Sequence, residues 1–84
     1  MAFGEFTIKD LKRIMREAAG EGDGADVDVA TIDTDFVELG YESLALLETG
    51  SRIERELGIK LDDETLFDSL TPRALIEAVN AKLN

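Results

Sequence analysis

Five consecutive residues near the middle of the chain, Gly40-Tyr41-Glu42-Ser43-Leu44, have the types and spacing that could support chemistry. They lie where a polar stretch rich in Gly and Asp gives way to an apolar pattern of helical period that runs from Leu44 to Leu57. This order places the hydroxyl of Ser43 in the first turn of a helix, where unpaired N–H groups and the helix dipole favour negative charge. The hydroxyl can therefore cap the helix or serve as the attachment point of a phosphate-linked group.

The composition excludes several other kinds of site. The 84 residues include no cysteine and no histidine, so the chain cannot assemble a cysteine nucleophile or a Ser-His-Asp triad. The aspartates do not form an EF-hand, because a loop beginning at Asp26 would need Gly and Glu where Thr31 and Val37 stand. We therefore expect a protein that is not an enzyme and has no dedicated metal site.

The charge distribution points to protein partners. The formal net charge of −10 would repel nucleic acid. From Glu17 to Ser51 the chain carries ten carboxylates and no Lys or Arg. Such a run can be a solvated loop, but its position around Ser43 favours an acidic docking surface for partners that carry Lys and Arg.

The chain also lacks the sequence features of a membrane or secreted protein. No apolar run is long enough to span a bilayer, and Met1 to Phe6 do not have the pattern of a secretion signal. We expect a cytoplasmic monomer that does not bind membranes.

The apolar periodicity predicts an all-α fold, a small bundle of three main helices and one short helix that spans residues 1–84 as a single domain. We expect a first helix capped by Thr7 that stops at Gly20, a second from about Ser43 to Leu57, a short helical turn at Asp62–Phe67, and a last helix opened by Thr71-Pro72.

A long loop must join the first two helices, and a loop of this length needs apolar anchors to stay ordered. The candidate anchors are Val27, Val29, Ile32, Phe36 and Leu39. The alternation of the two valines would permit short strands, but strands so short gain little, and we expect a pinned loop.

On a helical wheel the second helix has an inward stripe of Leu46, Gly50, Ile53 and Leu57, with Thr49 at its edge. Small residues at Thr49 and Gly50 either leave a cleft beside the helix or mark close packing. Interiors are normally filled, which favours packing.

The same wheel places Leu44 nearly opposite the inward stripe and Leu47 well off its centre. Isolated surface leucines are common. These two flank the first turn beside Ser43, so they are candidate partner contacts together with Glu42 and Glu48.

The segment Leu39–Glu48 resembles the attachment motif of acyl carrier proteins. Ala19-Gly20-Glu21, Phe36 and Thr71-Pro72-Arg73 are similar to the carriers of aromatic (type II) polyketide synthases, so the resemblance covers essentially the whole chain. It implies that Ser43 carries a 4′-phosphopantetheine arm derived from coenzyme A, whose thiol holds acyl groups as thioesters. Glu42 stands where the family usually has Asp, which keeps the carboxylate and lengthens it by one methylene.

The resemblance further implies a carrier of malonyl units and growing polyketide intermediates. Its partners would be a phosphopantetheinyl transferase, an acyltransferase, a ketosynthase/chain-length factor pair, and a ketoreductase or cyclase. One alternative is a fatty-acid carrier, although those usually have a more acidic second helix than Ala45, Leu46 and Thr49 provide. From another class, the chain could be an unmodified acidic interaction module in which Ser43 is only a cap.

Overall fold

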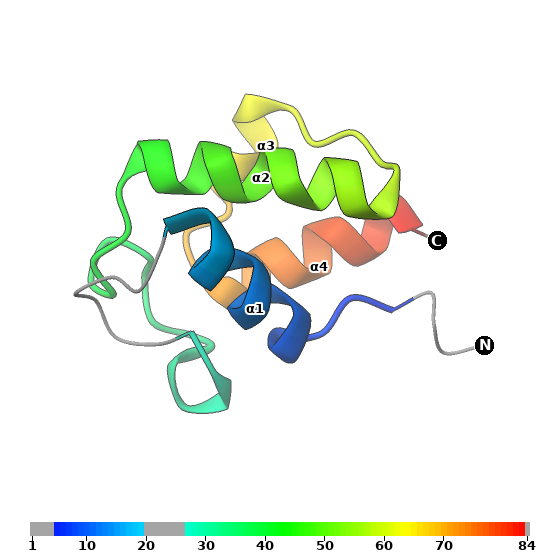
Figure 1. The fold of residues 1–84 in the computed structure, drawn as a ribbon. Helices are drawn as coiled ribbons and strands as arrows, with labels where there is room; N and C mark the ends of the chain where they lie inside the picture. The colour runs from blue at the N-terminus through cyan, green and yellow to red at the C-terminus, as the bar shows by residue number, and fades with distance from the viewer. Residues whose placement is uncertain (1–4, 20–26, 84) are drawn as a thin grey trace.

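The computed structural model describes residues 5–19 and 27–83 as an arrangement of helices (Figure 1). In order, these are α1 (Ile8–Ala19), a 3-10 helix η2 (Val29–Thr31), α2 (Ser43–Leu57), α3 (Asp63–Asp68) and α4 (Pro72–Leu83). No strand occurs in these two described segments. The prediction of three main helices and one short helix is confirmed, and the 3-10 helix η2 is an addition that was not predicted from the sequence.

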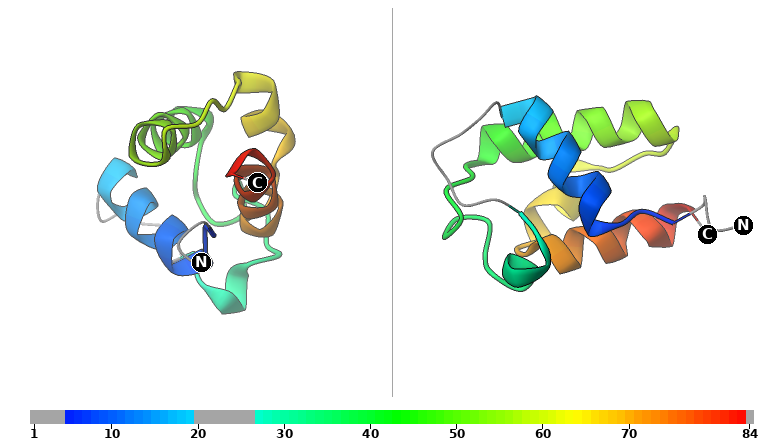
Figure 2. Two further views of the ribbon diagram at one scale, coloured as in Figure 1. Left: turned by 90° about the vertical axis from the view of Figure 1, so that its right-hand side faces the viewer. Right: turned by 60° about the horizontal axis from the view of Figure 1, so that its bottom comes forward.

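Helices α1 and α2 lie side by side and run in opposite directions. A guanidinium nitrogen of Arg13 lies 2.8 Å from a carboxylate oxygen of Glu56, and Arg52 lies 3.6 Å from Glu17. The pairs step forward along α1 and backward along α2, as an antiparallel arrangement requires. Figures 1 and 2 show α4 beside α1, running in the same general direction as α2. The hydrogen bond from Arg13 lowers the pKa of the Glu56 carboxyl.

The predicted helix starts are confirmed by their capping bonds. At α1 the backbone N–H of Thr7 donates to the carboxylate of Asp10 at 3.0 Å, and the N–H of Asp10 donates to the Thr7 hydroxyl at 3.3 Å. This is a reciprocal capping box with Asp in place of Glu. At α4 the N–H of Ala74 donates to the hydroxyl of Thr71 at 3.2 Å, and Pro72 is the first helical residue. The predicted stop of α1 at Gly20 lies outside the described residues.

The core is formed where α1, α2 and α4 meet the loop that precedes α2. Its members are apolar and almost completely shielded from solvent. They are Phe6, Leu11, Ile14, Met15, Val27, Phe36, Leu39, Ile53, Leu61, Leu66, Leu75 and Val79. None of the described helices is long and apolar enough to cross a membrane.

Backbone hydrogen bonds tie the loop before α2 to the α3–α4 connection and to the first turn of α4. The N–H of Phe36 donates to the carbonyl of Leu70 at 2.8 Å, and the N–H of Arg73 donates to the carbonyl of Ile32 at 2.9 Å. The guanidinium of Arg73 also binds the carboxylate of Asp33 at 2.7 Å and lowers its pKa. The predicted pinned loop is therefore confirmed, and polar groups contribute to holding it.

Three of the five expected apolar anchors are buried, namely Val27, Phe36 and Leu39. Ile32 is half-buried, whereas Val29 is 73% exposed, so its prediction as an anchor is wrong. The reason is local. The side chain of Asp28 accepts hydrogen bonds from the next backbone N–H groups and winds residues 29–31 into the 3-10 turn instead of an alternating strand.

Gly50 is a close-packing position between α2 and α3. A Cβ atom added there would lie 2.5 Å from Cδ1 of Leu66, whose side chain is buried. This contact confirms the packing interpretation at Gly50. Thr49, expected at the edge of the inward stripe, is fully buried, and its hydroxyl donates to the carbonyl of Ala45 at 2.8 Å.

Candidate functional site

Ser43 is the first residue of α2 and is exposed. The residue before it, Glu42, has the extended backbone of an N-cap (φ −98°, ψ 174°), and its side chain makes no capping hydrogen bond. The capping interpretation of Ser43 is therefore not supported. Among the described residues the Ser43 hydroxyl has no hydrogen-bond partner. It projects from a helix start whose first N–H groups lack intrahelical acceptors.

A tight turn fixes the approach to Ser43. The N–H of Tyr41 donates to the carbonyl of Phe36 at 2.9 Å, and Gly40 has a φ of 93°, which favours glycine. The rings of Phe36 and Tyr41 meet edge to face with centroids 6.3 Å apart. Because Phe36 is buried in the core, this turn connects the position of Ser43 directly to the packed interior.

Three of the predicted docking residues surround this serine on the surface. Glu42, Leu44 and Glu48 are exposed, with Leu44 at 69%. Leu47 is half-buried and packs against the core, so its prediction as a surface contact is only partly correct. A helical wheel shows only the direction of each side chain from its own helix, and it does not show how much of that helix the neighbouring elements cover.

Two features of α2 and of the turn that precedes it were not predicted from the sequence. Val37, in the turn that leads to Ser43, is an apolar residue that is 80% exposed. Glu54 accepts a hydrogen bond from the N–H of Leu61 at 2.6 Å and so fixes the segment that follows α2. The only signal for Glu54 was its position one turn before Gly58, whose left-handed backbone (φ 69°) ends the helix.

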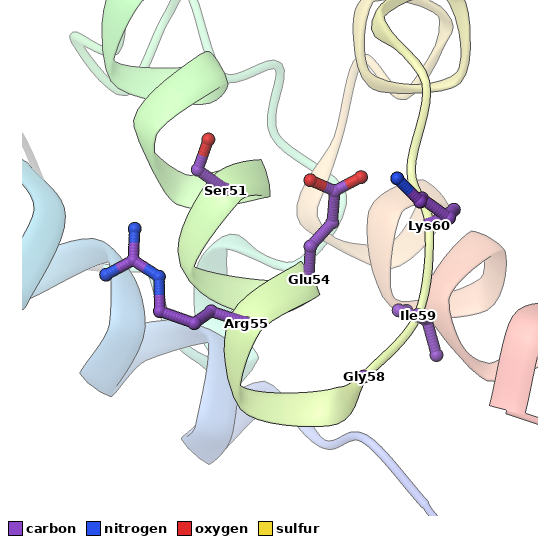
Figure 3. Close-up of a pocket in the computed structure, with 6 residues that line it drawn as sticks. All are labelled: Ser51, Glu54, Arg55, Gly58, Ile59 and Lys60. Carbon is purple, nitrogen blue, oxygen red and sulfur yellow. The ribbon is translucent and has the colours of Figure 1, made fainter.

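A shallow hollow of about 480 Å³ lies at the far end of α2 from Ser43 (Figure 3). It is lined by Ser51, Glu54, Arg55, Gly58, Ile59 and Lys60. A second hollow, of about 350 Å³, shares Ser51 and Arg55 with the first and reaches back to Leu47 and Glu48. Ser43 does not line either hollow.

The chemistry available at Ser43 is that of an acceptor hydroxyl. In the described part of the chain no group of three potential metal ligands comes together. A phosphodiester on the Ser43 oxygen would face solvent and would lie at the positive end of the α2 dipole, where negative charge is stabilised by about 0.3–1 kcal/mol. These residues therefore fit a phosphate-linked group.

Comparisons with known proteins agree with this geometry. Residues 9–79 match the family described as "Phosphopantetheine attachment site". The monensin polyketide synthase acyl carrier protein of Streptomyces virginiae is 62% identical over 93% of this chain and 88% of its own length. The granaticin counterpart of Streptomyces violaceoruber is 50% identical over 88% of this chain and 87% of its own. Among solved structures, the actinorhodin holo acyl carrier protein of S. coelicolor aligns with a TM-score of 0.81 at 39% identity, covering 94% and 92% of the two chains.

Replacement of Ser43 tests whether its hydroxyl has a structural role. Because the hydroxyl is exposed and unbonded in the described residues, we expect Ser43→Ala to change the free energy of unfolding by no more than about 0.5 kcal/mol. Chemical denaturation of the unmodified protein measures this.

Asp62→Ala is the matched capping control, because Asp62 accepts the N–H of Thr65 at 2.8 Å at the start of α3, and this variant should be measurably less stable. A loss of about 1 kcal/mol at Ser43 would instead indicate a capping serine.

Proposed function

Because this chain belongs to the acyl carrier proteins of type II polyketide synthases, we propose that the hydroxyl of Ser43 is the attachment point of its 4′-phosphopantetheine arm. The carriers of this family hold their cargo and do not themselves catalyse reactions on it. The bound arm supplies the thiol on which acyl groups are held, which agrees with the absence of cysteine from the chain.

The three serines of the chain differ in a way that supports this choice. Ser69 is buried and its hydroxyl donates to the carbonyl of Thr65 at 2.7 Å. Ser51 is exposed but lies in the middle of α2, far from the unpaired N–H groups of the helix start. Ser43 alone among the three combines exposure, an unbonded hydroxyl in the described structure and a position in the first turn of a helix.

The surface around Ser43 suits brief visits to several enzymes. In our proposal the carboxylates of Glu42 and Glu48 steer basic partner surfaces toward Ser43, and Leu44 makes the apolar contact, with half-buried Leu47 at its edge. Charge complementarity of this kind raises association rates more than it raises affinity, which allows rapid release.

The proposed partners are the phosphopantetheinyl transferase, the acyltransferase, the ketosynthase/chain-length factor pair, and a ketoreductase or cyclase. The cargo would be malonyl units and the growing polyketide. We further propose that residues 1–84 act as one carrier domain, as a monomer in the cytoplasm.

Incubation with coenzyme A, Mg²⁺ and a carrier-protein transferase tests the attachment site. Intact-protein mass spectrometry should show the gain of one phosphopantetheine arm by the parent chain and no gain by Ser43→Ala. Ser51→Ala is the matched control and should load like the parent. A parent chain that never gains mass, or a Ser43→Ala variant that does, would contradict the proposal, and the first result would favour an unmodified interaction module.

The apolar contact is tested after loading. We expect Leu44→Ala to reduce the efficiency of acyl transfer to the ketosynthase about tenfold, because loss of a buried leucine contact removes roughly 1.4 kcal/mol of binding free energy. Val29→Ala removes an equally exposed apolar residue away from α2 and is the control. Circular dichroism should show unchanged helix content in both. Equal transfer by the two variants would remove Leu44 from the docking surface.

A further inference from the structure

One exposed face of α2 extends well beyond the surroundings of Ser43. Leu44, Glu48, Ser51 and Arg55 are spaced by four, three and four residues, so they lie in one stripe along the helix. All four are exposed. Because an α-helix rises 1.5 Å per residue, Arg55 lies about 18 Å from Ser43 along the helix axis.

The charge reverses along this stripe. Glu42 precedes the stripe and Glu48 lies in its first half, whereas Arg55 lies at its far end and Lys60 lies in the segment after the helix. Neither Arg55 nor Lys60 has an ion-pair partner anywhere in residues 5–19 and 27–83. They are therefore two cations without an ion pair in the described residues, on a protein whose net charge is −10.

Three other arginines of the described structure differ in this respect. Arg13 and Arg52 are paired across the α1–α2 contact, and Arg73 is paired with Asp33. These three pairs join elements of the fold. The charges of Arg55 and Lys60 have no such structural use.

The two cations lie on opposite sides of the hollow in Figure 3, with Ser51 and Glu54 between them. Glu54 offsets one of the two positive charges. However, one of its oxygens already accepts the N–H of Leu61 at 2.6 Å, which commits this carboxylate to the backbone. The hollow and its neighbour, which meet at Ser51 and Arg55, leave room for side chains of another protein beside the guanidinium.

We propose that Arg55 and Lys60 form a second docking contact that receives a carboxylate-bearing surface of the ketosynthase/chain-length factor pair. This inference rests on the proposed function. A partner with basic groups around its entrance and carboxylates about 18 Å away would match the stripe in one orientation only. The reversed orientation would bring like charges together. The Arg55–Lys60 contact would thereby aim the arm on Ser43 into the partner's active site.

The test uses the loaded carrier and a ketosynthase/chain-length factor pair of a type II polyketide synthase. We expect Arg55→Glu/Lys60→Glu to raise the KM for the carrier about tenfold or more, with kcat within about twofold of the parent, and to weaken the salt dependence of kcat/KM. Arg55→Gln/Lys60→Gln should give a smaller rise in KM and retains the measurement if the double-Glu variant is unstable.

Lys9→Glu/Lys82→Glu is the matched control. It produces the same net charge, and Lys82, like Arg55, is in the last turn of its helix, but neither residue is on the stripe. Its KM should stay within about twofold of the parent. An equal rise in both variants, which would be a general charge effect, or no rise in either, would overturn the inference.

Arm attachment is measured first on every variant. Normal loading with an unchanged KM contradicts only the Arg55–Lys60 contact. A parent chain that cannot be loaded at Ser43 contradicts the proposed function, and the second contact with it.

Discussion

The hydrogen bonds that join the α1–α2 loop to the α3–α4 connection and to the first turn of α4 are the constraint on which the site depends. The described part of the loop has little regular structure apart from η2, yet it must hold Ser43 in a fixed position at the start of α2. The N–H of Phe36 reaches the carbonyl of Leu70, and the N–H of Arg73 reaches the carbonyl of Ile32. Both are backbone donors that would otherwise lose a partner on folding, so each bond serves the loop and the connection at once. Burial of Phe36 then fixes the turn that leads directly to Ser43.

Because the start of α2 is fixed, the exposed face of the whole helix has a fixed position relative to Ser43. The helix packs on α1 through one side and accommodates Leu66 at Gly50 on another, which leaves a single long face open to solvent. This face begins at Ser43 and ends at Arg55. A carrier has to present one oxygen to many enzymes in the correct orientation. A rigid helix with an acidic start and a basic end can do so without a binding cleft of its own.

Much of this fold could be predicted from the sequence, because its signals are local. Thr7 and Thr71-Pro72 indicate helix starts, and Gly58 indicates a helix end. The period of the apolar residues predicts the helices between these signals. The exposure of Ser43 followed from the same signals. The ion pairs and loop anchors could not be predicted, because Asp33 and Arg73 are 40 residues apart and only the packed fold brings them together. The predictions for Val29 and Leu47 failed for a related reason. Asp28 caps a 3-10 helix that leaves Val29 exposed, and the core of the packed fold covers part of the Leu47 side chain.

Amide hydrogen exchange on the unmodified protein tests the loop constraint most directly. Phe36 lies outside the helices and Arg73 lies in the first turn of α4, so neither amide has an intrahelical acceptor, and each depends for protection on its bond to Leu70 or Ile32. We expect them to exchange as slowly as the amide of Ile53 in the core of α2, through global unfolding, while the amide of Ser43 exchanges rapidly. If Phe36 and Arg73 exchanged as fast as Ser43 under conditions where Ile53 stays protected, the loop would open independently, and the bonds to the connection would not hold Ser43 in place.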